Sequence, residues 1–251
     1  MVSELPRTVA LVTEGRTDQF VLAAILSELA HARGLDLTIR PIQPKYDAIQ
    51  DSWSQGGWGH VYAWCRDIVA TYGSLEQYLD LLGIDLLLLQ LDADVAYMSY
   101  SDYASIGETD SRTHPLPIAT PCPHPPCAIP CHAVKTIPII LKSWLDTSHL
   151  PANVILCIPS KSMDAWIVGS MPMADFGKHQ HDHGLLEALE HLECLRNPEI
   201  CFSYTSKLGK SLRSYRNYEP TFRANLSRLA KRCVMAATFM HDLASALDRL
   251  G

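Results

Sequence analysis

The feature of this sequence that most restricts its fold is the continuous apolar run "IDLLLLQLDAD" at residues 84–94. A strand with apolar side chains at nearly every position is buried on both faces, which is typical of a parallel sheet covered by helices on both sides. Three further segments, 8–13, 36–43 and 152–162, also have the composition of strands. The chain is therefore expected to build a sheet of at least four strands.

Segments with helical spacing of apolar residues lie between and after these strands. We expect helices at 18–34, 60–73, 74–83, 133–146, from 163 onward, 184–196 and 221–249. Pro138 should bend the helix at 133–146 or mark its true start, because proline has no N–H to donate. This alternation predicts an α/β fold with a mainly parallel sheet flanked by helices, and with a helical C-terminal extension.

Acidic and hydroxyl side chains follow three of the expected strands, at the point where each strand ends. They are Glu14 and Asp18 after the first strand, Asp92 and Asp94 after the long apolar run, and Ser160, Ser162 and Asp164 after the last strand. The carboxyl ends of parallel strands share one edge of a sheet, where ligands bind in α/β proteins. We therefore expect these side chains to converge.

Converging carboxylates repel each other unless a cation lies between them. Mg²⁺ and Mn²⁺ prefer such oxygen ligands, and Asp92 and Asp94 point the same way in an extended segment, so both can reach one ion. Simpler explanations also exist. Glu14, Asp18 and Asp164 each suit a helix N-terminus, an effect worth about 0.3–1 kcal/mol, and the two aspartates at 92 and 94 suit a loop cap. Their coincidence at the strand ends favours the metal site.

A second group of metal-ligand types lies in "PCPHPPCAIPCHAVK" at residues 121–135. Cys122, Cys127, Cys131 and His132 are the residue types that hold a structural zinc ion. Their spacing differs from paired CxxC knuckles, and the prolines restrict how the chain can surround an ion, so we favour a proline-stiffened surface loop over a zinc site. The alternating histidines at 179–183 are likewise interpreted as a solvated loop.

Charge is distributed unevenly along the 251 residues, whose net charge is −6. Residues 201–251 carry 9 Lys and Arg against 3 Asp and Glu, whereas the first 200 carry 12 against 24. The basic residues between 204 and 233 alternate with tyrosines and are Lys207, Lys210, Arg213, Arg216, Arg223, Arg228, Lys231 and Arg232. Cations bind phosphates and aromatic rings stack on bases, so this stretch is a candidate nucleic-acid surface. The alternatives are a solvated helical face or ion pairs with the acidic first 200 residues.

Composition sets the broad class of protein. Hydrophobic residues make up 47% of the chain, enough for a sizeable core. No stretch reaches the ~18 apolar residues that a membrane helix needs, and the first residues lack the pattern of a secretory signal. The eight cysteines are spread over the chain, which favours reduced thiols over a disulfide framework. We expect a cytoplasmic protein that does not bind a membrane.

Two motifs carry a resemblance to a known family. "LVTEGRTDQFVL" followed by "LLLLQLDADV" resembles the Toprim domain, a Rossmann-like fold shared by topoisomerases, bacterial primases and nucleases of the overcoming-lysogenization-defect type. The resemblance covers roughly residues 8–170. It implies a catalytic domain over residues 1–170 with a Pro/Cys/His-rich insertion at about 99–132, and a helical, basic region at 171–251.

The resemblance also implies roles for particular residues. Asp92 and Asp94 would hold Mg²⁺ or Mn²⁺, with Asp18 or Asp164 completing the shell or binding a second ion, and Glu14 would act as general acid or base. Some members use a downstream lysine, for which Lys207 and Lys210 are the candidates. Lys161, Lys207 or Lys210 could offset charge on the scissile phosphate, while Arg213, Arg216 and Arg223 would contact nucleic acid.

The function implied by the resemblance is a metal-dependent nuclease acting on DNA or RNA, as an effector in bacterial defence against phage. One alternative is a non-catalytic Toprim-like module that binds a partner, and another is a nucleotidyl-transfer enzyme related to primases. The chain contains no "GxxxxGK[ST]" motif, so any ATPase would be a separate protein. The partners compatible with this interpretation are nucleic acid, a separate ATPase or sensor subunit, and a second copy of the chain.

Overall fold

A four-stranded parallel sheet forms the centre of the protein. The structure is a computed structural model that describes residues 6–47, 52–53, 56–98, 100, 131–160, 163–170 and 212–251. The strands run in the spatial order β2 (Leu37–Gln43), β1 (Arg7–Val12), β5 (Leu86–Gln90) and β6 (Val154–Cys157), and all three neighbouring pairs are parallel. A separate antiparallel pair joins β3 (Tyr46–Asp47) to β4 (Ser52–Trp53). The predicted α/β class with a parallel sheet is confirmed.

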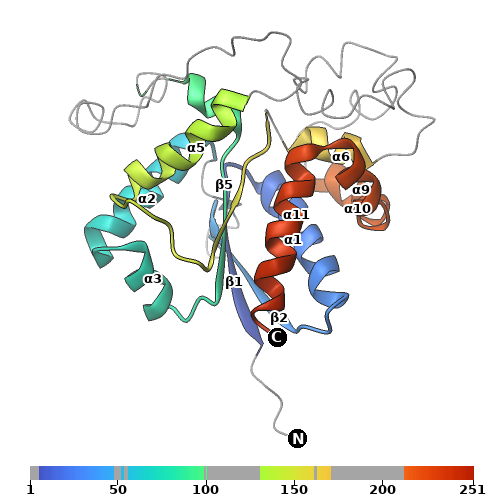
Figure 1. Ribbon diagram of the computed structural model, residues 1–251, viewed down its shortest axis with the longest axis horizontal. Helices are drawn as coiled ribbons and strands as arrows, with labels where there is room; N and C mark the ends of the chain where they lie inside the picture. The colour runs from blue at the N-terminus through green and yellow to red at the C-terminus, as the bar shows by residue number, and fades with distance from the viewer. Residues whose placement is uncertain are drawn as a thin grey trace, which may run out of the picture.

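Helices cover both faces of this sheet (Figure 1). One face carries α2 (Trp58–Tyr72), α3 (Leu75–Leu81) and α5 (Cys131–Trp144). The opposite face carries α1 (Arg16–His31), α6 (Asp164–Ser170), α9 (Leu212–Ala224), α10 (Leu226–Arg232) and α11 (Val234–Asp248). The sheet is therefore the middle of three layers, with a hydrophobic core on each side.

Strand β5 shows why the long apolar run folds as it does. Leu86 and Leu88 pack into the core beneath α1 and α11, whereas Leu87 and Leu89 pack into the core beneath α2 and α5. All four side chains are buried, and each buried leucine stabilises the fold by about 1.5–3 kcal/mol. Because successive strand residues point to opposite faces, only a continuous apolar run can fill both cores.

The C-terminal helices share the core of the sheet. Phe239 and Leu243 of α11 belong to the same hydrophobic cluster as Val9 of β1 and Leu88 of β5. Figure 1 shows α11 beside α1 on one face of the sheet. Residues 212–251 are thus packed against the α/β core itself.

One helix prediction needs correction, and one of the two alternatives given for Pro138 is excluded. Residues 221–249 form three helices and not one, because the backbone leaves the helical conformation at Asn225 and at Cys233. Pro138 does not mark the start of its helix, since α5 begins seven residues earlier at Cys131. The predicted helix at 184–196 lies outside the described residues. Among the helices that the structure describes, none is long and apolar enough to cross a membrane.

Candidate functional site

Strands β1, β5 and β6 end side by side, and hydrogen bonds from backbone N–H groups tie their ends together. After β5, the Asp92 N–H donates to Oε1 of Glu14, which follows β1, at 2.6 Å. The next N–H, that of Ala93, donates to the carbonyl of Pro159 after β6 at 2.8 Å. A short 3₁₀ helix, η1 (Ala93–Tyr97), then leads away from the edge. The segments that carry Glu14, Asp92 and Ser160 are therefore adjacent.

Gln90 links two of these strand ends. Its side chain is fully buried; Oε1 accepts the Glu14 N–H at 2.9 Å, and Nε2 donates to Oδ1 of Asp92 at 2.8 Å. The sequence reasoning missed this residue. The signal was present, because Gln90 is the one polar side chain inside the run "LLLLQL", and a buried polar group requires hydrogen-bond partners.

Electrostatics show that the predicted acids gather around Asp92. Burial raises the pKa of the Asp92 carboxyl well above its ordinary value, and the negative charges of four neighbouring carboxylates raise it further. Those neighbours, in order of their effect, are Glu14, Asp18, Asp94 and Asp164. We call these five residues the carboxylate cluster. The structure thus brings together all five acids that the sequence singled out, from the segments that follow β1, β5 and β6.

The chemistry of the carboxylate cluster suits a hard divalent cation. All five side chains would offer carboxylate oxygens as metal ligands. Their negative charges repel each other and raise the pKa of Asp92, and a bound cation would offset this repulsion. The neighbouring Ser160 is 1% exposed, and its Oγ has no hydrogen-bond partner. Across the described segments, however, no three His, Cys, Asp or Glu side chains already stand as a ready-made set of ligands. The residues fit a metal by their chemistry and their convergence.

Glycines allow the loop before α2 to press against the Glu14 backbone. Gly57 N–H donates to the Glu14 carbonyl at 2.6 Å. A Cβ at Gly56 would lie 2.5 Å from the same carbonyl oxygen, a distance that real Cβ atoms do not reach. At Gly15, a Cβ would lie 2.9 Å from Oδ2 of Asp18. Gly56 therefore excludes larger residues, because the atom in the way belongs to the backbone, whereas at Gly15 the end of the Asp18 side chain can shift. Both positions lie against the carboxylate cluster.

Helix α9 contributes a further residue that the sequence analysis did not identify. The hydroxyl of Tyr215 donates a hydrogen bond to Oδ1 of Asp164. Burial raises the pKa of Tyr215. The pKa is raised further by the charge of Asp164, by the hydrogen bond to Asp164 and by the charge of Asp18. The hydroxyl therefore keeps its proton and acts as a donor within the carboxylate cluster.

The described basic residues differ in what they contact. Arg216 is exposed on α9, whereas Arg223 forms ion pairs with Glu28 of α1 at 3.0 Å and Glu219 at 2.6 Å. Arg228 and Arg232 donate to carbonyls at the end of α6. Three of these arginines thus hold the protein together, whereas Arg216 and Lys231 are the exposed basic residues among the described members of this stretch.

Several predicted residues fall outside the described part of the chain. They are Lys161, Lys207, Lys210, Cys122 and Cys127, together with the side chains of Arg213, Cys131 and His132. Arg213 belongs to α9, and the last two begin α5. The lysine roles and the preference against zinc therefore remain predictions.

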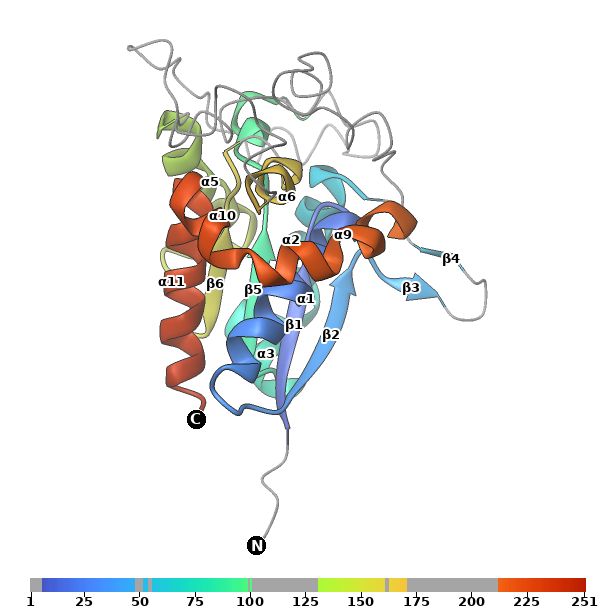
Figure 2. The same ribbon diagram turned by 90° about the vertical axis from the view of Figure 1, so that its right-hand side faces the viewer.

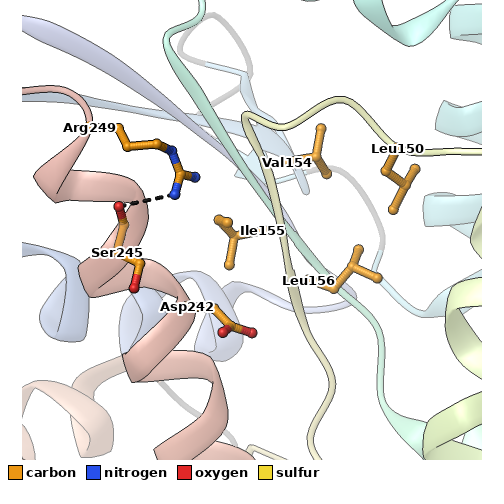
Figure 3. A pocket seen from close by; sticks show the side chains of 7 residues that line it. All are labelled: Leu150, Val154, Ile155, Leu156, Asp242, Ser245 and Arg249. Atoms are coloured by element: carbon orange, nitrogen blue, oxygen red, sulfur yellow. Dashed lines mark hydrogen bonds between the residues drawn. The ribbon is translucent and has the colours of Figure 1, made fainter.

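A shallow pocket of about 420 Å³ lies away from the carboxylate cluster, at the β6 edge of the sheet (Figure 3). Leu150, Val154, Ile155 and Leu156 line one side, and Asp242, Ser245 and Arg249 of the α11 segment line the other. Arg249 donates to the carbonyls of Ser245 at 3.1 Å and Ala152 at 3.4 Å. None of the five acids contributes to this pocket, so we assign it no part in the chemistry of the cluster.

Fold and site together define an α/β protein with acidic residues gathered at the carboxyl edge of a parallel sheet. Comparisons with protein-family models, with curated proteins and with solved structures find no match. The relation to the Toprim domain accordingly stays a prediction from the two sequence motifs.

Proposed function

We propose that this protein is a Mg²⁺- or Mn²⁺-dependent phosphodiesterase that cleaves nucleic acid, with a Toprim-like site. One observation carries the proposal, namely the convergence of Glu14, Asp18, Asp94 and Asp164 on Asp92 at the carboxyl edge of the sheet. Like charges held close together destabilise a fold, so a chain that gathers five carboxylates has a use for the arrangement. Perturbed carboxylates of this kind are typical of catalytic sites.

The acids divide into two roles. Asp92 and Asp94, with Asp18 or Asp164, would hold the cation, which when bound supplies Lewis-acid stabilisation of the phosphate and a more acidic water. Glu14 is fixed by the Asp92 N–H at 2.6 Å. A carboxylate held in one orientation can accept or return a proton at a defined position, as a general acid or base requires.

The phosphate-binding part of the proposal rests on charge. Arg216 is exposed on the same helix as Tyr215, whose hydroxyl reaches the cluster, and it is proposed to contact a phosphate of the bound nucleic acid. Lys161, Lys207 and Lys210 are proposed to add positive charge there. A role in phage defence and a separate ATPase or sensor partner are proposed from the family resemblance alone.

Cleavage of plasmid DNA and of RNA by the purified protein with Mg²⁺ or Mn²⁺ tests this function. Glu14→Gln should lower the cleavage rate by at least about 10²-fold, the scale of positioned acid–base catalysis, and Asp92→Asn should lower it through weaker binding of the cation. Asp80→Asn, on the exposed side of α3, is the matched control and should leave the rate unchanged. Cleavage that survives in both site variants would contradict the assigned roles, and no cleavage with any metal would favour a non-catalytic partner-binding module.

A further inference from the structure

Tyr215 lies where the C-terminal helices meet the carboxylate cluster. It is 3% exposed, and its ring packs edge-on against Phe20 of α1 with a centroid separation of 6.4 Å. Its hydroxyl donates to Oδ1 of Asp164, 51 residues earlier in the chain. Figure 2 shows α9 lying across α1 with α6 next to it. Packing thus fixes the ring, and the ring fixes the direction from which Asp164 receives its hydrogen bond.

Asp164 sits on a helix that the C-terminal region also holds at its other end. Helix α6 has seven residues, and Asp164 is the first. At its last turn, Arg232 donates to the Gly169 carbonyl and Arg228 to the Ser170 carbonyl, both at 3.2 Å. Cations at these carbonyls complete a helix C-terminus. Helix α10 therefore fixes the end of α6, and Tyr215 fixes the carboxylate at its start.

We propose that Tyr215 is a positioning residue that orients the Asp164 carboxylate toward Asp92 and so completes the metal site from the C-terminal helices. This inference rests on the proposed function. A short helix on its own leaves an aspartate side chain free to choose among rotamers, whereas a hydrogen bond to one carboxylate oxygen leaves the other in a defined direction. Partners that orient metal ligands in this way are worth about 10–100-fold in metal affinity.

The test measures Mn²⁺ binding to the full chain by electron paramagnetic resonance of the free ion. Tyr215→Phe keeps the ring against Phe20 and removes only the hydroxyl, so it should weaken Mn²⁺ binding about tenfold. Tyr218→Phe is the matched control on the same helix. Burial alone raises the pKa of Tyr218, without a contribution from the acids of the cluster, so its hydroxyl should not affect binding.

A double-mutant cycle separates positioning from a general structural effect. In an Asp164→Asn background, Tyr215→Phe should no longer change Mn²⁺ affinity, because the residue through which the hydroxyl acts is already altered. A second variant, Asp164→Glu, keeps the charge but moves it by one methylene, and should weaken binding about tenfold whether or not Tyr215→Phe folds.

The outcomes separate this inference from the proposed function. If the wild type binds Mn²⁺ and Tyr215→Phe or Asp164→Glu binds it equally well, the positioning role is overturned and the metal site stands. An equal loss for Tyr215→Phe in the wild-type and Asp164→Asn backgrounds also overturns the positioning role. Wild-type protein that binds no Mn²⁺ overturns the metal site and this inference together.

Discussion

Gln90 is the residue on which the geometry of the carboxylate cluster most depends. Its amide can satisfy an acceptor and a donor at once, and here it bonds the Glu14 N–H and the Asp92 carboxylate. A carboxylate at position 90 would repel Asp92, and an apolar side chain would leave both partners without this bond. Glutamine is thus suited to hold two strand ends together inside an acidic site.

Replacing Gln90 with methionine should therefore destabilise the protein by about 1–3 kcal/mol, since the partly buried Glu14 N–H loses its acceptor while the side-chain volume is nearly kept. Urea denaturation followed by circular dichroism measures the change. Gln77→Met, at an exposed position of α3, is the control and should stay within about 0.5 kcal/mol of the wild type. Equal stability of the two variants would show that the Gln90 bonds are not formed.

At the scale of elements, the sequence pattern predicted the features that are set by residues close together in the chain, namely the strands, the helices and the acids that follow the strands. A continuous run of leucines is typical of a strand buried on both faces, and the acids that follow the strands can be read directly from the sequence. Gln90 could be singled out as the polar residue inside the apolar run, but its partners and those of Tyr215 could not be predicted, because they depend on which strands and helices pack together. The helix breaks at Asn225 and Cys233 could not be predicted either. Three consecutive helices that pack on one core keep the same spacing of apolar residues as a single long helix.

The loop before α2 supplies a prediction for an element. Gly56→Ala would place a Cβ 2.5 Å from the Glu14 backbone oxygen, so either the loop or Glu14 must move, at a cost of about 1–3 kcal/mol. Since Glu14 carries the proposed acid–base role, nucleic-acid cleavage should fall as well as thermal stability.

Gly34 offers a matched control for Gly56. It has a φ of +66° with nothing within 4 Å of an added Cβ, so Gly34→Ala should cost about 1–2 kcal/mol through backbone strain alone and leave the rate of the folded enzyme unchanged. The cleavage rates of the two variants are compared well below their unfolding temperatures. Equal rates would contradict the claim that the small size of Gly56 is needed to keep Glu14 in place.

At the scale of the whole molecule, the cluster concentrates negative charge where the sheet and both flanking layers meet. Acids from segments after β1, β5 and β6 converge, and the C-terminal helices hold one of them in place. A ligand that binds only the folded state stabilises it, by about 2.7 kcal/mol at a concentration 100 times its dissociation constant. Mn²⁺ should therefore raise the melting temperature of the wild type in differential scanning calorimetry, and should not raise that of Asp92→Asn. An equal rise in both proteins would place the ion elsewhere.

The same charge predicts how stability depends on pH without metal. Because the pKa of Asp92 is raised above its ordinary value of 3.8, the folded state keeps this proton at pH values where the unfolded chain has lost it. The stabilisation from Asp92 is therefore complete below about pH 3.8 and is lost as the pH rises through the folded pKa. Asp92→Asn removes this loss while keeping an oxygen for Gln90, so the variant should melt at a higher temperature than the wild type at pH 8.

Near pH 3 the advantage of Asp92→Asn should disappear, because the wild-type carboxyl is then protonated in both states. Melting curves at a series of pH values in chelator-treated buffer measure the difference between the two proteins. Asp80→Asn, at an exposed carboxyl far from the cluster, should follow the wild type throughout. If the difference in melting temperature between Asp92→Asn and the wild type does not grow with pH, then Asp92 does not lie in a desolvated position among repelling carboxylates.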